Sequence, residues 1–215
     1  MTVQDAATRL QVRYVLPPFF HEIPVGGDAE ETGEALLAAA RELMPGGDTD
    51  DWFAWILLTV SQLDALHEAR AVYAGFCLLD MEGRNSTANV VITHTGLREP
   101  DAPEATAATF AAALRSAHPD ASVHRMALPC GPAVAKVEGR TAPFPPETVE
   151  VAEAYAGERR HVRLGSIQVF VPLPNERELL TLEMTTPDME DWDFYSRMFS
   201  DTVRSIECWE EPDGA

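Results

Sequence analysis

The clearest pattern in the chain is in its last quarter, where apolar and polar residues alternate over 166–173 and again over 178–185. A period of two is that of β-strands with one buried face. Beyond Pro187 the period becomes that of a helix, with an apolar stripe formed by Trp192, Tyr195, Phe199, Val203 and Ile206. We therefore predict a hairpin over 160–186 with a C-terminal helix packed on it.

Two local details of this region follow from single residues. Pro172 donates no backbone hydrogen bond, so we expect it at a bulge or a strand edge of the hairpin. Asp188 precedes the helical pattern and Asp191 stands three positions later, so we expect Asp188 to cap the last helix.

The first half of the chain predicts two helices followed by a hairpin. Asp28 with Glu31, and Asp48 with Asp51, have the spacing of capping boxes, so helices should begin near 29 and 49. The second helix should lie on the core through a stripe with helical period, namely Trp52, Trp55, Ile56, Thr59, Val60, Leu63 and Leu66. Strands should then cover 71–80 and 87–95, with a turn at Gly83.

The middle of the chain predicts one more helix and one more hairpin. The helix should follow Asp101, with Pro103 in its first turn and Glu104 at the capping-box position. Strands over 122–128 and 133–138 should flank a turn at 129–132. The proline-rich stretch 141–157 indicates a loop that covers one edge of the sheet.

This order of elements favours an α+β fold, with a mostly antiparallel sheet of about six strands flanked by helices. A chain of 215 residues suits a single domain, which we place at residues 11–208. Residues 1–10 should be a flexible N-terminus, and residues 209–215 an acidic disordered tail.

Several motifs in the second half resemble a known family. The runs 128–134 (LPCGPAV), 167–174 (IQVFVPLP) and 180–187 (LTLEMTTP), together with the closing aromatic helix, look like the PsbP/Mog1-like α/β/α sandwiches of small actinobacterial accessory proteins. Members of that family serve as photosystem subunits, small-GTPase binders and envelope lipoproteins. The resemblance implies a binding scaffold without a shared reaction.

Charge and composition limit the partners. The chain has 35 acidic and 16 basic residues and a formal net charge of -19, which disfavours nucleic acid and anionic membranes. The first ten residues lack the pattern of a secretory signal, so we expect the cytoplasm. Cys77, Cys130 and Cys208 have no metal-binding spacing, and we expect reduced thiols in that compartment.

No motif assembles a reactive or metal-binding centre. The six histidines have no zinc-site spacing, and Asp48, Asp50 and Asp51 are better explained as helix-capping groups than as calcium ligands. Glycine pairs such as Gly26-Gly27 lack the pattern of a phosphate-binding loop. We therefore predict no catalytic residue, no metal and no cofactor.

The leading hypothesis is a non-enzymatic protein-binding accessory, adaptor or immunity-type protein. Phe19, Phe20 and Trp209 belong to no clear stripe, which makes them the candidate interface residues. A homo-oligomer is one form that such binding could take. The alternative is a small-molecule-binding protein or hydrolase, with a pocket between sheet and helices that uses Cys130, His124 or His94.

Overall fold

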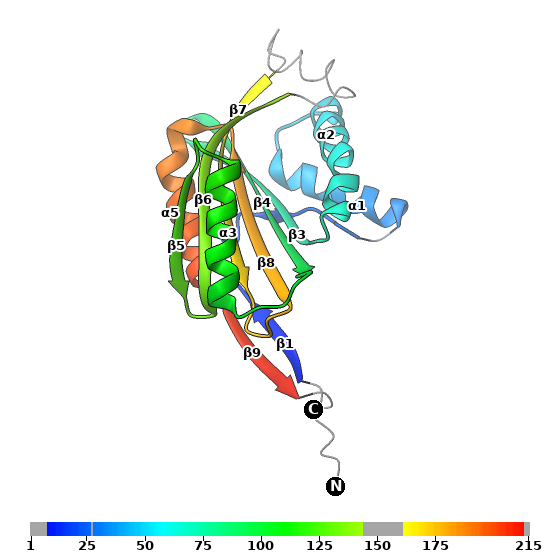
Figure 1. The fold of residues 1–215 in the computed structure, drawn as a ribbon. Coiled ribbons are helices and arrows are strands. Elements are labelled where there is room, and N and C mark those ends of the chain that lie inside the picture. Colours follow the sequence, from blue (N-terminus) through cyan, green and yellow to red (C-terminus); the bar gives the residue numbers. More distant parts are fainter. Residues whose placement is uncertain (1–7, 27, 144–160, 213–215) are drawn as a thin grey trace.

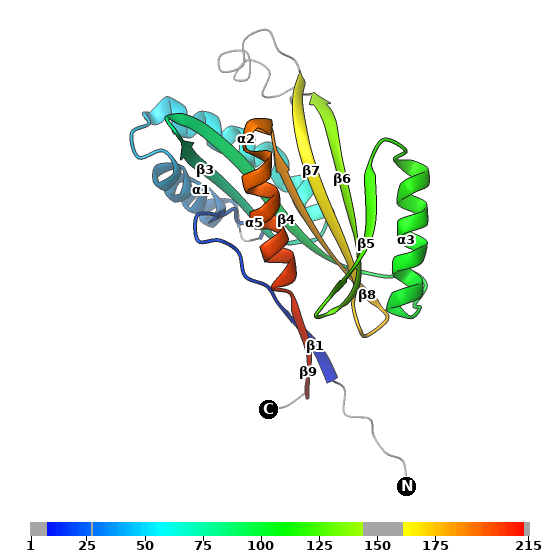
Figure 2. The same ribbon diagram turned by 90° about the vertical axis from the view of Figure 1, so that its left-hand side faces the viewer.

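The protein has the α+β fold that the sequence predicted, and its antiparallel sheet has seven strands where about six were expected (Figure 1). The computed structural model describes residues 8–26, 28–143 and 161–212. The strand order is β2-β3-β4-β8-β7-β6-β5, and a separate two-stranded ribbon joins β1 to β9. Helix α5 covers one face of the sheet, whereas α1, α2 and α3 lie on the other (Figure 2).

The elements agree with most of the predicted boundaries. The strands are β1 (Thr8–Arg13), β2 (His21–Glu22), β3 (Ala71–Met81), β4 (Arg84–Gly96), β5 (Ser122–Leu128), β6 (Gly131–Pro143), β7 (His161–Pro172), β8 (Glu178–Thr186) and β9 (Glu207–Pro212). The helices are α1 (Ala29–Leu43), α2 (Thr49–Glu68), α3 (Pro103–Ala117) and α5 (Trp192–Arg204), with a short 3-10 turn at Met189–Asp191. Of the predicted loop 141–157, residues 141–143 belong to β6, and the remainder lies outside the described residues.

The alternating pattern of the last quarter sets the register of the β7–β8 hairpin. Val171 pairs with Leu180, Val169 with Leu182 and Ile167 with Met184, so these apolar side chains share one face. Tyr195, Phe199, Val203 and Ile206 of the α5 region are buried against that face, as predicted. Pro172 pairs with Leu179 at the last position of β7, so it stands at the strand end and not in a bulge.

The predicted cap of the last helix is wrong. The Asp188 carboxylate accepts hydrogen bonds from the backbone N–H (2.7 Å) and the hydroxyl (3.1 Å) of Thr87 on β4, and no helix amide is capped by it. Arg84 donates to Asp191 at 2.9 Å, and this guanidinium holds the pKa of Asp191 below its usual range. The start of α5 is therefore fixed by contacts to β4.

Of the other predicted helix caps, those of α1 and α2 are present and that of α3 is absent. Asp28 accepts from the amides of Glu30 and Glu31, and Asp48 forms the predicted reciprocal box with Asp51. At α3, by contrast, the residue before the helix is Ala102, and no side chain caps the first turn. The Asp101 carboxylate accepts only from the adjacent amide of Ala102, and Glu104 pairs instead with Arg125 on β5.

Gly165 on β7 lies directly beneath the first turn of α5. A Cβ at this position would stand 2.5 Å from Cζ3 of Trp192 and 3.0 Å from Sδ of Met189. We expect Gly165→Ala to lower the free energy of unfolding by about 1–3 kcal/mol, because the indole must move to make room. Urea unfolding measures this, and Gly139→Ala, on exposed backbone of the neighbouring strand with open space at its Cβ, is the control that should change little.

Helix α2 packs less closely than its stripe predicted. Ala54 and Thr59 are its buried residues, Trp55, Ile56 and Leu66 are half-buried, and Val60 is exposed. Trp55 reaches the sheet, where its ring centroid lies 5.9 Å from that of Phe76 on β3. The helix therefore stands partly clear of the sheet.

The two ends of the described chain form one antiparallel ribbon. Thr8 pairs with Pro212, and the pairing continues to Arg13 and Glu207, whose side chains also form an ion pair at 2.5 Å. Residues 8–10 and 209–212, which were expected in flexible ends, are paired in this ribbon. Residues 1–7 and 213–215 lie outside the described residues.

Cys130 and Cys208 form a disulfide, which contradicts the predicted reduced thiols. Their Cα atoms are 5.3 Å apart, although 78 positions separate them in the sequence. The bond ties the ribbon strand β9 to the turn between β5 and β6. Cys77 is free and buried, and burial raises the pKa of its thiol to about 11. None of the helices in the described part of the chain is both long and apolar enough to cross a membrane.

Candidate functional site

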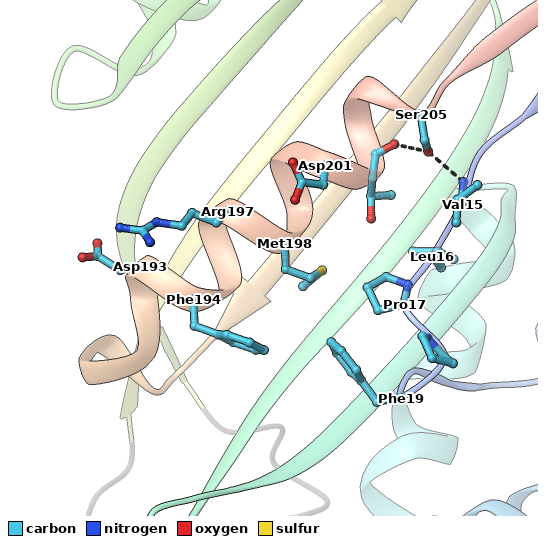
Figure 3. A pocket seen from close by; sticks show the side chains of 12 residues that line it. Val15, Leu16, Pro17, Phe19, Asp193, Phe194, Arg197, Met198, Asp201 and Ser205 are labelled. Carbon is cyan, nitrogen blue, oxygen red and sulfur yellow. Dashed lines mark hydrogen bonds between the residues drawn. The ribbon is translucent and has the colours of Figure 1, made fainter.

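An apolar groove of about 840 Å³ runs between α5 and the segment 15–19, which connects β1 to β2 (Figure 3). This volume is in the range of ligand clefts in proteins. The groove is lined by Val15, Leu16, Pro17, Pro18, Phe19, Asp193, Phe194, Arg197, Met198, Asp201, Thr202 and Ser205. Figure 3 shows Phe194 and Phe19 turned toward one another from opposite walls.

The wall 15–19 takes its shape from its prolines and its anchors, and it turns at residues 18–19, where the Phe20 amide donates to the carbonyl of Pro17 at 3.2 Å. Pro17 and Pro18 fix their own backbone angles, and proline also favours an extended residue before it. The Val15 amide donates to Oγ of Ser205 at 2.8 Å, which ties the start of the wall to the end of α5. At its other end Phe20 is buried in the main core, and the amide of Ile23 donates to the carbonyl of Ala74 on β3 at 2.8 Å.

The opposite wall consists of residues that lie beside the buried stripe of α5. Phe194 precedes the fully buried Tyr195, and Met198 precedes the buried Phe199, so each lies on the flank of the helix. The Phe194 ring contacts Tyr195 edge to face at 5.3 Å and Phe19 at 6.2 Å. A row of aromatic rings thus leads from the groove into the core, and aromatic contacts of this kind add about 0.5–1.5 kcal/mol each.

Charged groups are confined to the rim of the groove. Asp201 forms an ion pair with Arg204 at 3.4 Å, one helical turn further along α5. In Figure 3 the side chains of Asp193 and Arg197 point away from the segment 15–19. An apolar floor with a polar rim is typical of protein-binding surfaces.

The lining side chains are suited to binding more than to bond-breaking. The Ser205 hydroxyl is engaged by the Val15 amide and itself donates to the carbonyl of Thr202 at 2.7 Å. Neither histidine nor cysteine lines the groove. What the groove offers a ligand is two aromatic rings, a thioether and proline rings.

The three predicted interface residues have different positions. Phe19 lies in the groove, but Phe20 exposes only 8% of its surface and packs in the core, so it is no exposed anchor. Trp209 on β9 is 45% exposed, and it lines a separate hollow with Arg13 and Pro129. The structure therefore brings only Phe19 to the groove.

The residues of the predicted alternative do not converge. Cys130 is in the disulfide, so it is not a free nucleophile. His94 is on β4, 3.5 Å from a carboxylate oxygen of Glu178, whereas His124 is on β5 and contacts Ser122 at 3.0 Å. Three strands separate β4 from β5, which corresponds to about 19 Å across the sheet.

The aspartates considered as calcium ligands serve the helix. Asp48 accepts from the amides of Asp50 and Asp51, so its carboxylate is part of the α2 cap. Among the described residues, no group of three or more His, Cys, Asp or Glu side chains is arranged to hold a metal ion.

Of the groove residues, sequence reasoning found only Phe19 and missed the others, among them Val15, Leu16, Phe194 and Met198. A signal was present, because Phe194 and Met198 are four residues apart, lie outside the core stripe and are both apolar. That pair indicates a second apolar strip on α5. The opposite wall could not be found in this way, because it requires the segment 15–19 to run beside α5.

The fold and the groove define an α+β protein with an apolar groove beside its C-terminal helix. The chain matches no protein-family model and no curated protein sequence, so similarity assigns it to no family. The resemblance to PsbP/Mog1-like sandwiches therefore rests on its three sequence motifs and stays a hypothesis.

Proposed function

We propose that this protein acts without catalysis, as a protein-binding accessory, adaptor or immunity-type component, and that the groove holds an apolar segment of a partner protein. The observation that carries the proposal is the exposure of apolar side chains in one concave place. Phe194 is 39% exposed and Val15 is 62% exposed, and both line the same groove as Phe19. Apolar side chains gathered in this way mark interaction sites, whereas scattered ones do not.

Recognition through side chains fits this groove better than strand addition. Pro17 and Pro18 supply no backbone N–H, so this stretch of the wall cannot pair fully with an added strand. A partner side chain placed between Phe19 and Phe194 would bury its apolar surface against both rings. Full burial of one such side chain contributes about 1.5–3 kcal/mol.

The charge of the protein indicates what flanks the partner's apolar anchors. With a formal net charge of -19, the protein attracts basic segments over long range and repels acidic ones. The same field disfavours a nucleic-acid partner or an anionic membrane. We therefore propose a partner segment with aromatic or aliphatic anchors flanked by Lys or Arg.

The cytoplasm expected from the sequence stays a prediction. The Cys130–Cys208 disulfide weighs against it, because reducing compartments keep most protein thiols in the reduced state. Alkylation of thiols in freshly lysed cells distinguishes the two states. Alkylation of Cys130 and Cys208 in addition to Cys77 would favour a reducing compartment.

A photo-crosslinking amino acid at position 194 tests the proposed function. We expect a covalent adduct with a different protein in native lysate, because position 194 lines the groove. Phe53 on α2 is the matched control: it is also an exposed phenylalanine, at 65%, but lies outside the groove. No adduct at 194, equal adducts at both positions, or an adduct only with a second copy of this chain contradicts the proposal.

The partner identified in that adduct allows a quantitative test with purified proteins. Phe194→Asp should weaken its binding roughly thirtyfold, the loss typical of a central interface residue. Phe53→Asp should leave the dissociation constant unchanged. The association rate should also fall with added salt if basic residues flank the anchors.

A further inference from the structure

A second cavity lies beneath helix α2, on the face of the sheet opposite α5. Its volume is about 530 Å³, and α2 contributes Trp55, Leu58 and Leu66 to its roof. The floor is the sheet, where Phe76, Val91 and Glu183 come from β3, β4 and β8. We call this space the α2 cavity.

The α2 cavity follows from the way in which α2 packs. The apolar stripe of α2 faces the sheet, yet Trp55, Leu58 and Leu66 remain half-buried because the helix stands partly clear. Protein interiors are normally close-packed, so a space of this size between an apolar helix face and a sheet is unusual. It has the size and the apolar wall of a small-molecule site.

A polar cluster lies on the floor of the α2 cavity. The Glu183 carboxylate accepts hydrogen bonds from Gln168 (2.8 Å), from Ser166 (3.2 Å) and from the Arg140 guanidinium (3.3 Å). These three donors occupy most of the acceptor positions of one carboxylate. Glu183 is therefore already engaged by the protein.

Arg140, unlike Glu183, has hydrogen-bonding capacity left over. Its guanidinium carries five N–H donors and contacts Glu183 at 3.3 Å, while its positive charge also helps to lower the pKa of Glu138. The side chain is half-exposed and lines the α2 cavity, where it is the sole cation among the lining residues. Its remaining donors suit an acceptor group on a ligand, and best a charged one.

We propose that the α2 cavity binds a small organic anion with a flat apolar body and one carboxylate or sulfonate head. The body lies against Trp55 and Phe76, and the head accepts hydrogen bonds from Arg140. This site is separate from the groove, because the two share no lining residue and lie on opposite faces of the sheet. The protein then has two binding sites, one for a metabolite-sized anion and one, under the proposed function, for a partner segment.

Two fluorescent probes that differ by one charged group test the proposal with the full-length chain. Anilinonaphthalene sulfonate has the flat apolar body and the anionic head, and N-phenylnaphthylamine has the same body without the head. We expect wild-type protein to bind one molecule of either probe per chain. Arg140→Gln should weaken binding of the sulfonate roughly tenfold or more, and leave binding of the neutral probe unchanged.

Two further variants separate the α2 cavity from other apolar surfaces. Leu58→Trp puts a bulky indole ring in the roof of the cavity and should weaken the binding of both probes. Arg197→Gln removes a positive charge from the rim of the groove and should weaken neither. Circular dichroism and thermal unfolding verify that each variant is folded, and Leu58→Trp still tests whether the probes bind in the α2 cavity if Arg140→Gln does not fold.

Several results would overturn the proposal. These are no binding by wild-type protein, unchanged sulfonate binding by Arg140→Gln, unchanged binding by Leu58→Trp, or a loss of binding in Arg197→Gln. The last result would show that the probe binds in the groove and not in the α2 cavity. None of them affects the crosslinking test at position 194, so the two proposals fail independently.

Discussion

Replacing Cys208 with alanine should lower the free energy of unfolding by about 4.5 kcal/mol. The disulfide to Cys130 closes a loop across a sequence separation of 78, and the entropy that such a link removes from the unfolded chain corresponds to this value. The folded state also loses the covalent tie between β9 and the β5–β6 turn. Urea unfolding followed by tryptophan fluorescence, without reductant, measures the difference.

The internal control is the pair of single variants and their combination. Cys130→Ala should cost about as much as Cys208→Ala, and the double variant should cost no more than either, because all three remove one bond. Thiol titration in denaturant should detect one thiol, that of Cys77, before reduction and three afterwards. Three thiols before reduction, or additive losses of stability, would show that the bond does not form.

Phe199→Ala should be almost as damaging, with a loss of about 3–5 kcal/mol. Phe199 is 1% exposed and packs on α5 against the sheet, so truncation removes its buried contacts and leaves a cavity. Phe194→Ala, five residues earlier on the same helix, should cost less, about 1–2 kcal/mol, because Phe194 is 39% exposed and its loss removes ring contacts to Phe19 and Tyr195 without leaving a cavity in the core.

This pair separates folding from binding. Both substitutions are phenylalanine to alanine within one helix, so their effects on intrinsic helix propensity are alike. Denaturant unfolding should therefore report the difference in packing alone. A loss at Phe194 as large as that at Phe199 would mean that the groove is part of the core, and the proposed interface would then have to be abandoned.

Local and periodic features of this fold could be predicted from the sequence. The alternation over 166–185 sets the pairing of β7 with β8, because a shift by one residue would expose every apolar side chain of that face. The caps at Asp28 and Asp48 were predicted for a similar reason, since each carboxylate reaches amides two or three residues away. Such contacts join residues that are near one another in the sequence, so they can form without any distant partner.

Features that depend on residues distant in the sequence could not be predicted. Asp188 has the spacing of a cap, but the amide and hydroxyl of Thr87 on another strand provide a competing partner. Cys130 and Cys208 meet only because β9 leaves α5 toward the β5–β6 turn. The same limit applies to both candidate sites, since each is formed between elements that the sequence predicts separately.

The β1–β9 ribbon has a mechanical consequence. Its strands are antiparallel with Thr8 opposite Pro212, so a force that pulls the two ends apart loads one pair at a time, beginning with that outermost pair. Rupture would advance inward until it reaches Cys208, which is opposite Val12 and is covalently held by Cys130. Tension on β9 then passes through sulfur into the β5–β6 turn, which shields α5 from a pull on the C-terminal end.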